Sequence, residues 1–418
     1  MKKYFLLLIL FQYTVLSQPQ SVGELLFTEL HNFKSGEVNR SYLLYKIPFS
    51  NLVFQKEGNI FKAGVKAGVE IFNDSSRSVY RDYTEKIISV DEFELTNDKN
   101  SYLQGIIEFS LPSGKYKIYS SFTDINSIRE LKSKPHTLKT DSTNIITNPI
   151  IVHSDKILCD TLQLFNIANF SGTIPFSSEL FSILIPVAEE NSDGLEIKAH
   201  YEGEVIFNEI ITEYFHSPFE FTICNNKVVL NNSANTKNLK YFIAKDISAK
   251  LKEGIVSIKI SYKSEPEKQD SFQIPVIWIN KPHALLDLEK SIQHLKLIES
   301  SELIDKLERS SRDNLEKDFY SLWKKYDPTP ETEFNELMHE FYKRVDYAEL
   351  NFRPLASKNG AKSDRGKIYI QFGNPDSMVR FTDEYGRMVE TWMYSNPQRS
   401  LMFVDKRGNG NFTLVNSQ

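Results

Sequence analysis

Three acidic side chains near the C-terminal end of the chain, Asp364, Asp376 and Glu390, are of a type that could support catalysis. Two carboxyl groups that flank a glycosidic bond can serve as general acid and as base or nucleophile, and most glycoside hydrolases use such a pair. The reaction depends on the distance between the two groups, which sequence spacing does not give. A hydrolase that cleaves a polymer is therefore one hypothesis for this chain.

Two of these acids lie in a stretch with strong turn chemistry, GAKSDRGKIYIQFGNPD, Gly360–Asp376. Gly360 and Gly366 can adopt backbone angles that other residues avoid, and Asp364 can accept hydrogen bonds from nearby backbone N–H groups. The alternating run Lys367–Phe372 predicts a strand, and the Gly-Asn-Pro-Asp sequence after it predicts a turn. Because bends and turns account for nearly every residue type here, we favour a structural role over catalysis.

An arginine and two aromatic residues complete the candidate site. The planar fork of Arg365 suits a carboxylate, so Arg365 can pair with Asp364, Asp376 or Glu390. Trp392 can be exposed for a ligand or buried in a core, and the core role is the more common one for such a ring. The candidate binding residues are Asp364, Arg365, Tyr369, Asp376, Glu390 and Trp392.

Other catalytic and cofactor-binding patterns are missing from the sequence. It contains no Gly-x-Ser-x-Gly elbow, no Gly-x4-Gly-Lys-Ser/Thr phosphate loop and no dinucleotide fingerprint. The eight histidines are scattered, with no pair at metal-ligand spacing. We therefore expect neither a cofactor nor a bound metal.

Composition indicates a folded protein of several domains. The chain has 418 residues, of which 40% are hydrophobic and 25% charged, which is typical of globular proteins and too long for one ordinary core. Its 29 Phe and 20 Tyr favour β structure. The net charge of −5 argues against nucleic acid as the main partner.

The N-terminus resembles an export signal. Met1-Lys2-Lys3 is a short basic start, the apolar run Tyr4–Phe11 follows, and Val15-Leu16-Ser17 offers a cleavage site that makes Gln18 the mature start. The run is too short to cross a bilayer, which takes about 20 residues, and no later stretch is long enough. The sequence predicts a signal peptide over residues 1–17 and a mature protein that is soluble in the periplasm or at the cell surface, without a transmembrane span.

The chain has two cysteines, Cys159 and Cys224. In an oxidising compartment they can pair, and a loop of this length stabilises a protein by roughly 4 kcal/mol in the loop-entropy estimate. The alternative is two unpaired thiols, because spacing alone does not reveal whether the two Cα atoms are close.

Residues 18–281 show the pattern of strands and turns. Gly105–Leu111 and Lys115–Phe122, joined by Pro-Ser-Gly, predict a hairpin. The polar stretch Lys132–Asn148 separates this region from a second set of strands, so we expect two tandem β-sandwich, immunoglobulin-like domains over 18–148 and 149–281. No Trp lies between the cysteines, which argues against a true immunoglobulin core.

From residue 282 the hydrophobic period changes to that of helices. The apolar face starts with Leu285, Leu288, Ile292, Leu295 and Ile298, so residues 282–326 are predicted to be a helical linker. A further helix is predicted to start with Thr329 as N-cap and Pro330 in its first turn.

The C-terminal strands predict a small sheet. Met388–Tyr394, Leu401–Val404 and Phe412–Val415, with the strand predicted before them, would form four antiparallel strands that the preceding helices cover. The fold class is thus multidomain and mainly β, with two sandwiches, a helical segment and a C-terminal α+β domain over residues 327–418.

The motif around Asp364 resembles the signature of the GWxTD-domain proteins, a family of exported bacterial proteins. The signature's Gly-Trp-x-Thr-Asp, Arg-Gly, Gly-x-Pro-Asp and E-x-W-x-Y elements match Gly360, Asp364, Arg365, Gly366, Ile368, Tyr369, Gly373, Pro375, Asp376, Glu390, Trp392 and Tyr394. Ala361 stands where the family has Trp, and Ser363 replaces Thr. No firm activity is attached to the family, so the resemblance implies location and fold more than a reaction.

These observations favour an exported, non-catalytic binding or assembly protein of the bacterial cell envelope. Its expected partners are other envelope proteins or surface polymers, because sandwich loops and edge strands can present ligands while the cores stay rigid. The alternative is a hydrolase that acts on an envelope polymer through paired carboxylates.

Overall fold

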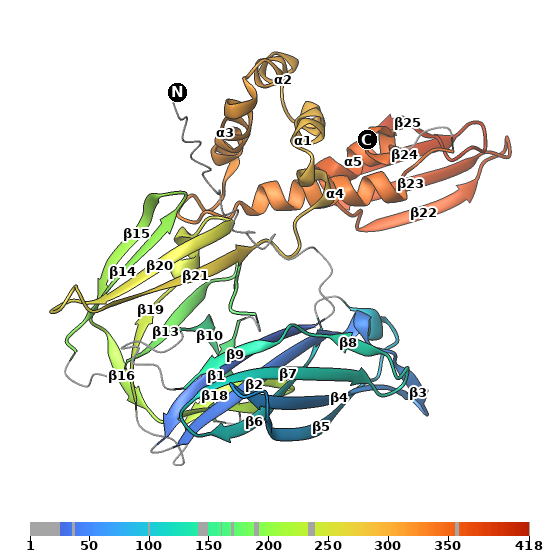
Figure 1. The fold of residues 1–418 in the computed structure, drawn as a ribbon. Coiled ribbons are helices and arrows are strands. Elements are labelled where there is room, and N and C mark those ends of the chain that lie inside the picture. The colour runs from blue at the N-terminus through green and yellow to red at the C-terminus, as the bar shows by residue number, and fades with distance from the viewer. Residues whose placement is uncertain are drawn as a thin grey trace, which may run out of the picture. The chain divides into compact units, whose positions relative to one another are not determined.

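The computed structural model describes residues 26–35, 38–98, 101–140, 149–159, 161–168, 171–187, 192–232, 239–355 and 359–417. The predicted signal peptide lies outside the described residues. The chain divides into two compact units, the first formed by Met1–Pro175 with Leu180–Ile277 and the second by Phe176–Glu179 with Trp278–Gln418. Figure 1 shows the elements of both units. The predicted mainly β fold is confirmed.

The first β region of unit 1 consists of two antiparallel sheets. One has the strand order β1-β2-β6, and the other has the order β3-β4-β7-β8, with β5 paired to β4 and β9 paired to β7. The two strands of the predicted hairpin are present as β6 and β7, but the hairpin prediction was wrong: β6 pairs with β2 and β7 pairs with β4, in different sheets. The strands are β1 (Phe27–Ser35), β2 (Val38–Pro48), β3 (Gln55–Glu57), β4 (Ile60–Asn73), β5 (Ser78–Val90), β6 (Tyr102–Leu111), β7 (Lys115–Asp124), β8 (Glu130–Lys132) and β9 (His136–Lys139).

The second β region also has two sheets, ordered β16-β19-β13-β10-β11-β18-β17 and β12-β21-β20-β14-β15. A disulfide joins Cys159, at the end of β10, to Cys224, at the end of β17. The strands are β10 (Ile150–Cys159), β11 (Leu162–Ile167), β12 (Ile174–Pro175), β13 (Phe181–Val187), β14 (Leu195–Tyr201), β15 (Glu204–Ile211), β16 (Tyr214–Ser217), β17 (Phe219–Cys224), β18 (Lys227–Asn232), β19 (Leu239–Ala244), β20 (Gly254–Tyr262) and β21 (Gln269–Ile277).

Strand β2 contributes side chains to two hydrophobic cores. Its successive side chains point to opposite faces of the sheet. Leu43 and Tyr45 pack with β4 and β7 residues in the core of the first region, whereas Tyr42 and Leu44 pack with residues of the second, such as Phe221. All four β2 side chains are buried.

Unit 2 combines helices with a four-stranded antiparallel sheet of order β22-β23-β24-β25. The helices are α1 (Leu288–His294), α2 (Ser301–Glu308), α3 (Arg312–Trp323), α4 (Glu336–Asn351) and α5 (Asp364–Phe372), and the strands are β22 (Ser377–Thr382), β23 (Met388–Ser395), β24 (Gln398–Asp405) and β25 (Phe412–Ser417). Short 3-10 helices in the two units are η1 (Phe49–Asn51), η2 (Glu94–Asn97), η3 (Ile247–Lys250), η4 (His283–Leu286), η5 (Leu295–Leu297), η6 (Lys324–Tyr326) and η7 (Gly360–Lys362). One core cluster joins the helices to the inner face of the sheet, and its strand residues are Trp392, Tyr394, Leu401, Phe403 and Phe412.

Two local predictions in this unit were wrong. The predicted strand Lys367–Phe372 is part of helix α5, because Ser363 accepts a hydrogen bond from the Gly366 N–H and caps a helix there. A short alternating apolar run does not by itself distinguish a strand from a buried helix. The fourth strand of the sheet is β22 instead.

The predicted helix start at Thr329 was the second error. Helix α4 begins at Glu336, and its N-cap is Asn335, whose side chain accepts a hydrogen bond from the Met338 N–H at 2.8 Å. Thr329 instead donates to the Glu336 carboxylate at 2.6 Å. The real cap also donates to the Trp323 carbonyl at 2.9 Å, so tertiary contact decided between two residues that both suit an N-cap.

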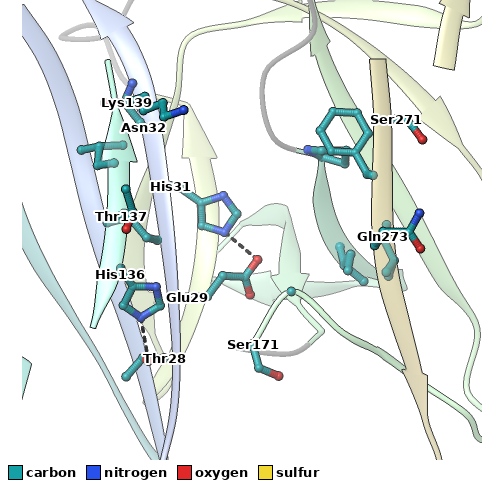
Figure 2. Close-up of a pocket in the computed structure, with 17 residues that line it drawn as sticks. Thr28, Glu29, His31, Asn32, His136, Thr137, Lys139, Ser171, Ser271 and Gln273 are labelled. Atoms are coloured by element: carbon teal, nitrogen blue, oxygen red, sulfur yellow. Dashed lines mark hydrogen bonds and ion pairs between the residues drawn. The ribbon is translucent and has the colours of Figure 1, made fainter. Parts of the chain in front are cut away.

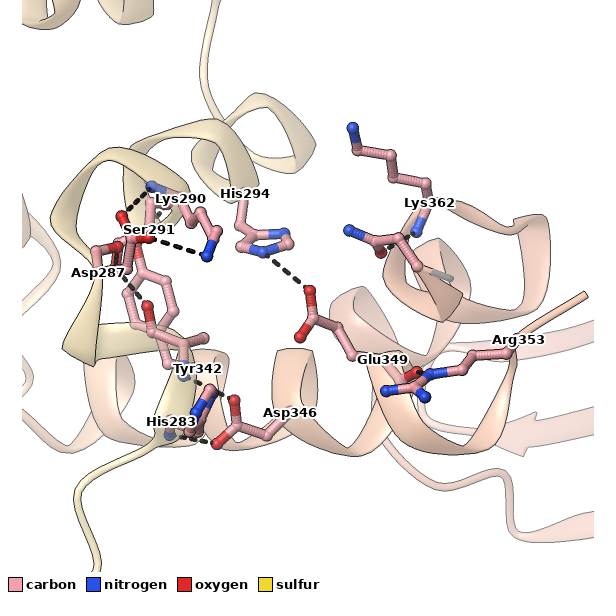
Figure 3. Close-up of polar contacts among 12 residues, drawn as sticks. His283, Asp287, Lys290, Ser291, His294, Tyr342, Asp346, Glu349, Arg353 and Lys362 are labelled. Atoms are coloured by element: carbon pink, nitrogen blue, oxygen red, sulfur yellow. Dashed lines mark hydrogen bonds and ion pairs between the residues drawn. The ribbon is translucent and has the colours of Figure 1, made fainter. Parts of the chain in front are cut away.

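Polar contacts hold the start of the helical segment on α4 (Figure 3). The Asp346 carboxylate accepts the His283 and Ala284 N–H groups at 2.6 and 2.8 Å. The Tyr342 hydroxyl donates to the Ser291 carbonyl at 2.9 Å, and His294 lies 3.5 Å from the Glu349 carboxylate. In the part of the chain that the structure describes, no helix is long and apolar enough to cross a bilayer.

Two histidines of unit 2, His294 on α1 and His339 on α4, make the unit sensitive to acid. Burial, which outweighs the attraction of Glu349, holds the pKa of His294 below its usual value. Burial, with Lys343 nearby, does the same for His339. Both therefore bind a proton less readily in the folded protein than in the unfolded chain, where their usual pKa is about 6.5.

We therefore expect unit 2 to be most stable above pH 6.5 and to lose stability as the pH falls from there towards the lower folded pKa. Linkage limits the loss to about 1.4 kcal/mol per pH unit for each histidine. Urea denaturation between pH 7.5 and 5 measures it, and His294→Gln should flatten the dependence. An identical pH profile in the variant would show that His294 does not contribute.

Candidate functional site

The predicted site centres on a buried ion pair between α5 and the sheet. Nη1 of Arg365 donates to Oε1 and Oε2 of Glu390 at 3.1 and 3.0 Å. The Arg365 side chain is 9% exposed and that of Glu390 is 1% exposed. Arg380, on β22, donates to Oε1 of Glu390 as well, through Nε at 2.8 Å and through Nη2. The structure thus brings one carboxylate between two guanidinium groups.

The Arg365 guanidinium also lies against aromatic rings and a turn. It stands 3.9 Å from the ring centroid of Phe412 and 5.3 Å from that of Phe352. Nη2 lies 3.5 Å from the Gly410 carbonyl. The Arg365 side chain therefore joins α5 to the end of α4 and to the hairpin between β24 and β25 through cation–π contacts. Its ion pair with Glu390 joins α5 to β23 as well.

The shape of that hairpin depends on Asp405. Its carboxylate accepts the N–H groups of Arg407, Asn409 and Gly410 at 3.2, 3.2 and 2.7 Å. Burial raises the pKa of the Asp405 carboxyl, but these N–H donors outweigh it and keep the pKa below its usual value. Asp405 stays charged and holds the turn that presents Gly410 to Arg365.

The two aromatic candidates are packing residues. Trp392 is 1% exposed and lies between Phe352 and Phe403, at 5.4 and 4.9 Å between ring centroids. Tyr369 stacks on Tyr347 at 4.5 Å with an interplanar angle of 19°. Of the two roles considered for Trp392, the structure places it in the core.

The other two acids do not join Glu390 in a shared set of contacts. Asp364, in the first turn of α5, accepts the Leu414 N–H at 3.0 Å. Asp376 accepts the Ser395 N–H at 2.5 Å, and its hydrogen bonds with Ser395 lower its pKa. Each of the three carboxylates thus binds a different partner in the protein.

The two glycines of the motif serve close packing, and the expectation that they need unusual backbone angles was wrong. Neither has a positive φ. A Cβ on Gly360 would lie 2.1 Å from the Ala348 carbonyl oxygen, and one on Gly366 would lie 2.1 Å from the Gly360 carbonyl oxygen. They allow η7 to lie between the ends of α4 and α5.

The motif's remaining positions follow from the same geometry. Ser363 caps α5 with its hydroxyl, a task that Thr can also perform. Ala361 is 1% exposed and belongs to the core cluster, so the position points inward. Sequence reasoning missed Arg380 and Asp405, although Arg380 is directly opposite Glu390 in the β22–β23 register and a predicted β22 would have revealed it.

Comparison with known proteins assigns one part of the chain to a known domain family. No curated protein matches it. Among solved structures, a structure of Bifidobacterium dentium beta-glucuronidase complexed with coumarin-3-O-glucuronide is similar at 10% identity, with a TM-score of 0.18, over 62% of this chain and 49% of that one. The chain therefore spans about half the length of that structure. The model of the GWxTD domain family matches residues 261–417, and the C-terminal part of this chain is a GWxTD domain.

Proposed function

We propose that this protein is an exported, non-catalytic binding or assembly protein of the bacterial cell envelope, and that its C-terminal sheet docks an extended segment of a partner protein. The observation that carries the proposal is the apolar outer face and free edge of this sheet. It is the face opposite the one that carries Trp392 and Leu401 into the core.

Alternation along the strands assigns the outer face. Trp392 and Glu390 point inward, so Thr391 and Met393 point outward, together with their cross-strand partners Val379 and Ser377. Val379, Phe381 and Met393 are 48, 44 and 40% exposed. Contiguous exposed apolar side chains of this kind mark interaction sites more often than isolated ones do.

The edge of the sheet favours an extended polypeptide as the occupant. Among the described strands, β22 pairs only with β23, and all six of its residues are exposed. A strand at a sheet edge presents unpaired backbone N–H and C=O groups, to which a partner strand can add. Apolar side chains of that strand would then contact Val379 and Phe381.

Two further observations support the rest of the proposal. The carboxylates that a hydrolase would need each accept hydrogen bonds from protein groups, as described above, which favours a structural role for them. The Cys159–Cys224 disulfide is typical of proteins in an oxidising compartment, which favours export.

A photocrosslinking amino acid at Phe381 tests the docking surface in the native envelope. We expect a discrete adduct with one partner, and we expect Val379→Lys in the same chain to abolish it without changing the melting temperature, because the position is exposed. The matched control places the crosslinker at Lys367, which is exposed on α5. Equal adducts from both positions, or adducts that Val379→Lys leaves unchanged, would contradict docking at β22.

The hydrolase alternative has its own outcome. If Asp364→Asn leaves the melting temperature unchanged and abolishes turnover of an envelope polymer, the protein is an enzyme and the non-catalytic role is wrong.

A further inference from the structure

A polar cleft within unit 1 takes no part in the role proposed above. Its volume is about 830 Å³, and its walls come from β1, β9 and β21. Figure 2 shows Glu29 and His31 projecting into it from β1, with β21 across from them and the Ser271 and Gln273 side chains on the far side of β21. A cavity of this size is within the range that small-molecule sites occupy, roughly 300–1,000 Å³.

The centre of the cleft holds a buried carboxylate with a free oxygen. Glu29 is 8% exposed and His31 is 3% exposed. Oε1 of Glu29 lies 3.0 Å from Nε2 of His31, whereas Oε2 is buried and has no hydrogen-bond partner in the described part of the chain. Since buried polar atoms are nearly always hydrogen-bonded, this oxygen points to a donor that a ligand supplies.

The sequence of β1 makes this pair unusual. Phe27, Glu29, His31 and Phe33 alternate along the strand and so share one face. Phe27 and Phe33 pack in the core that joins the two β regions. Apolar residues at the two middle positions would serve packing alone, so the acid and the imidazole interrupt an otherwise apolar face.

The surrounding groups select the class of ligand. Thr137 and Ser171 line the cleft with neutral hydroxyl groups, which both donate and accept hydrogen bonds. Lys139 also lines it, so the cleft carries one positive side chain as well as the negative Glu29. A cationic ligand would meet Lys139 and an anionic one would meet Glu29, whereas a neutral polyol would be repelled by neither.

A second histidine, His136 on the β9 wall, is hydrogen-bonded within the protein. Nε2 of His136 and the Thr28 hydroxyl are 2.9 Å apart, which ties β9 to β1 beside the carboxylate. The wall is therefore fixed before a ligand arrives, and pre-organised polar groups lose little freedom on binding.

We propose that this cleft binds a neutral saccharide, with Oε2 of Glu29 accepting a sugar hydroxyl and with the Thr137 hydroxyl bonding to the sugar from the β9 wall. The site is separate from the docking face of the C-terminal sheet, so either proposal can fail without the other.

Isothermal titration calorimetry on the full exported chain tests the site with cellotetraose, maltotetraose, mannotetraose and tetra-N-acetylchitotetraose as neutral probes. Spermidine and tetragalacturonate serve as the charged probes. We expect saturable one-to-one binding of at least one neutral probe, and Glu29→Gln should weaken it at least about tenfold, because the amide removes the charged acceptor. Glu85→Gln, the same change at an exposed position of β5, should bind like the wild type.

Thr137→Ala provides a second variant, at an exposed hydroxyl of the β9 wall, and should also weaken binding, whether or not Glu29→Gln folds. The proposal is overturned if no neutral probe binds at concentrations up to about 10 mM, a Kd beyond which specific contacts contribute little. It is equally overturned if a folded Glu29→Gln binds like the wild type, or if only a charged probe binds.

Discussion

Glu390→Gln should lower the free energy of unfolding of unit 2 by about 3–5 kcal/mol, the usual loss when one partner of a buried ion pair is removed. The glutamine keeps the size of the side chain but leaves the guanidinium of Arg365 uncompensated. Arg365 is buried beneath Phe412 and cannot reach water, whereas Arg380 has a side chain that is 54% exposed and can turn to solvent. The loss therefore comes from Arg365.

Urea denaturation followed by tryptophan fluorescence measures this effect in the right unit, because Trp278, Trp323 and Trp392, the three tryptophans of the chain, all belong to unit 2. Glu384→Gln is the matched control: it makes the same chemical change at an exposed position of the β22–β23 hairpin and should change stability by less than about 0.5 kcal/mol.

The double variant Arg365→Met with Glu390→Met separates charge from packing. Two apolar side chains of similar size leave no buried charge, so stability should recover in part relative to Glu390→Gln. A midpoint for Glu390→Gln that equals the wild-type midpoint would mean that Arg365 is not held by this carboxylate in solution.

The second large effect is expected from Gly366→Ala. The added methyl group would stand 2.1 Å from the Gly360 carbonyl oxygen and 2.9 Å from the Ala361 Cα atom. Both are backbone atoms, which cannot rotate away as a side chain can. We expect a loss of about 3 kcal/mol, the upper end of the usual cost of overpacking, because α5 has to move off η7.

Gly408→Ala is the contrasting variant for this test. Its φ is +62°, and a Cβ there would meet nothing within 4 Å, so only the backbone conformation is strained, by about 1–2 kcal/mol. Thermal unfolding of both variants shows which costs more stability, the close backbone contact at Gly366 or the backbone strain at Gly408. If Gly366→Ala is the milder change, close approach of the backbones is not what the motif glycines provide.

The sequence predicted the architecture well where patterns are long. The β regions, the change to helical period near residue 282 and the strands from Met388 onward were all visible as periodicity. The short run Lys367–Phe372 was not, because its alternation fits a strand and a helix equally. Only packing against α4 and the cap at Ser363 make it a helix.

The candidate site shows what pattern reasoning leaves out. Arg365 had three acids as candidate partners, and its choice of Glu390 depends on the sheet register, which a single sequence does not specify. Glu29 and His31 escaped notice because polar residues in an alternating strand are normally assigned to the solvent side. Their burial becomes visible only once a second sheet covers that face.

Because β2 has side chains in the cores of both β regions, it constrains how this architecture can change during evolution. Cutting the chain between β9 and β10 and expressing the halves separately would leave Tyr42 and Leu44 in water on one piece and Phe221 on the other. We therefore expect the two β regions to fold together, despite the polar stretch between them. Duplication, exchange or fusion in related proteins would have to move the whole segment from β1 to β21 together.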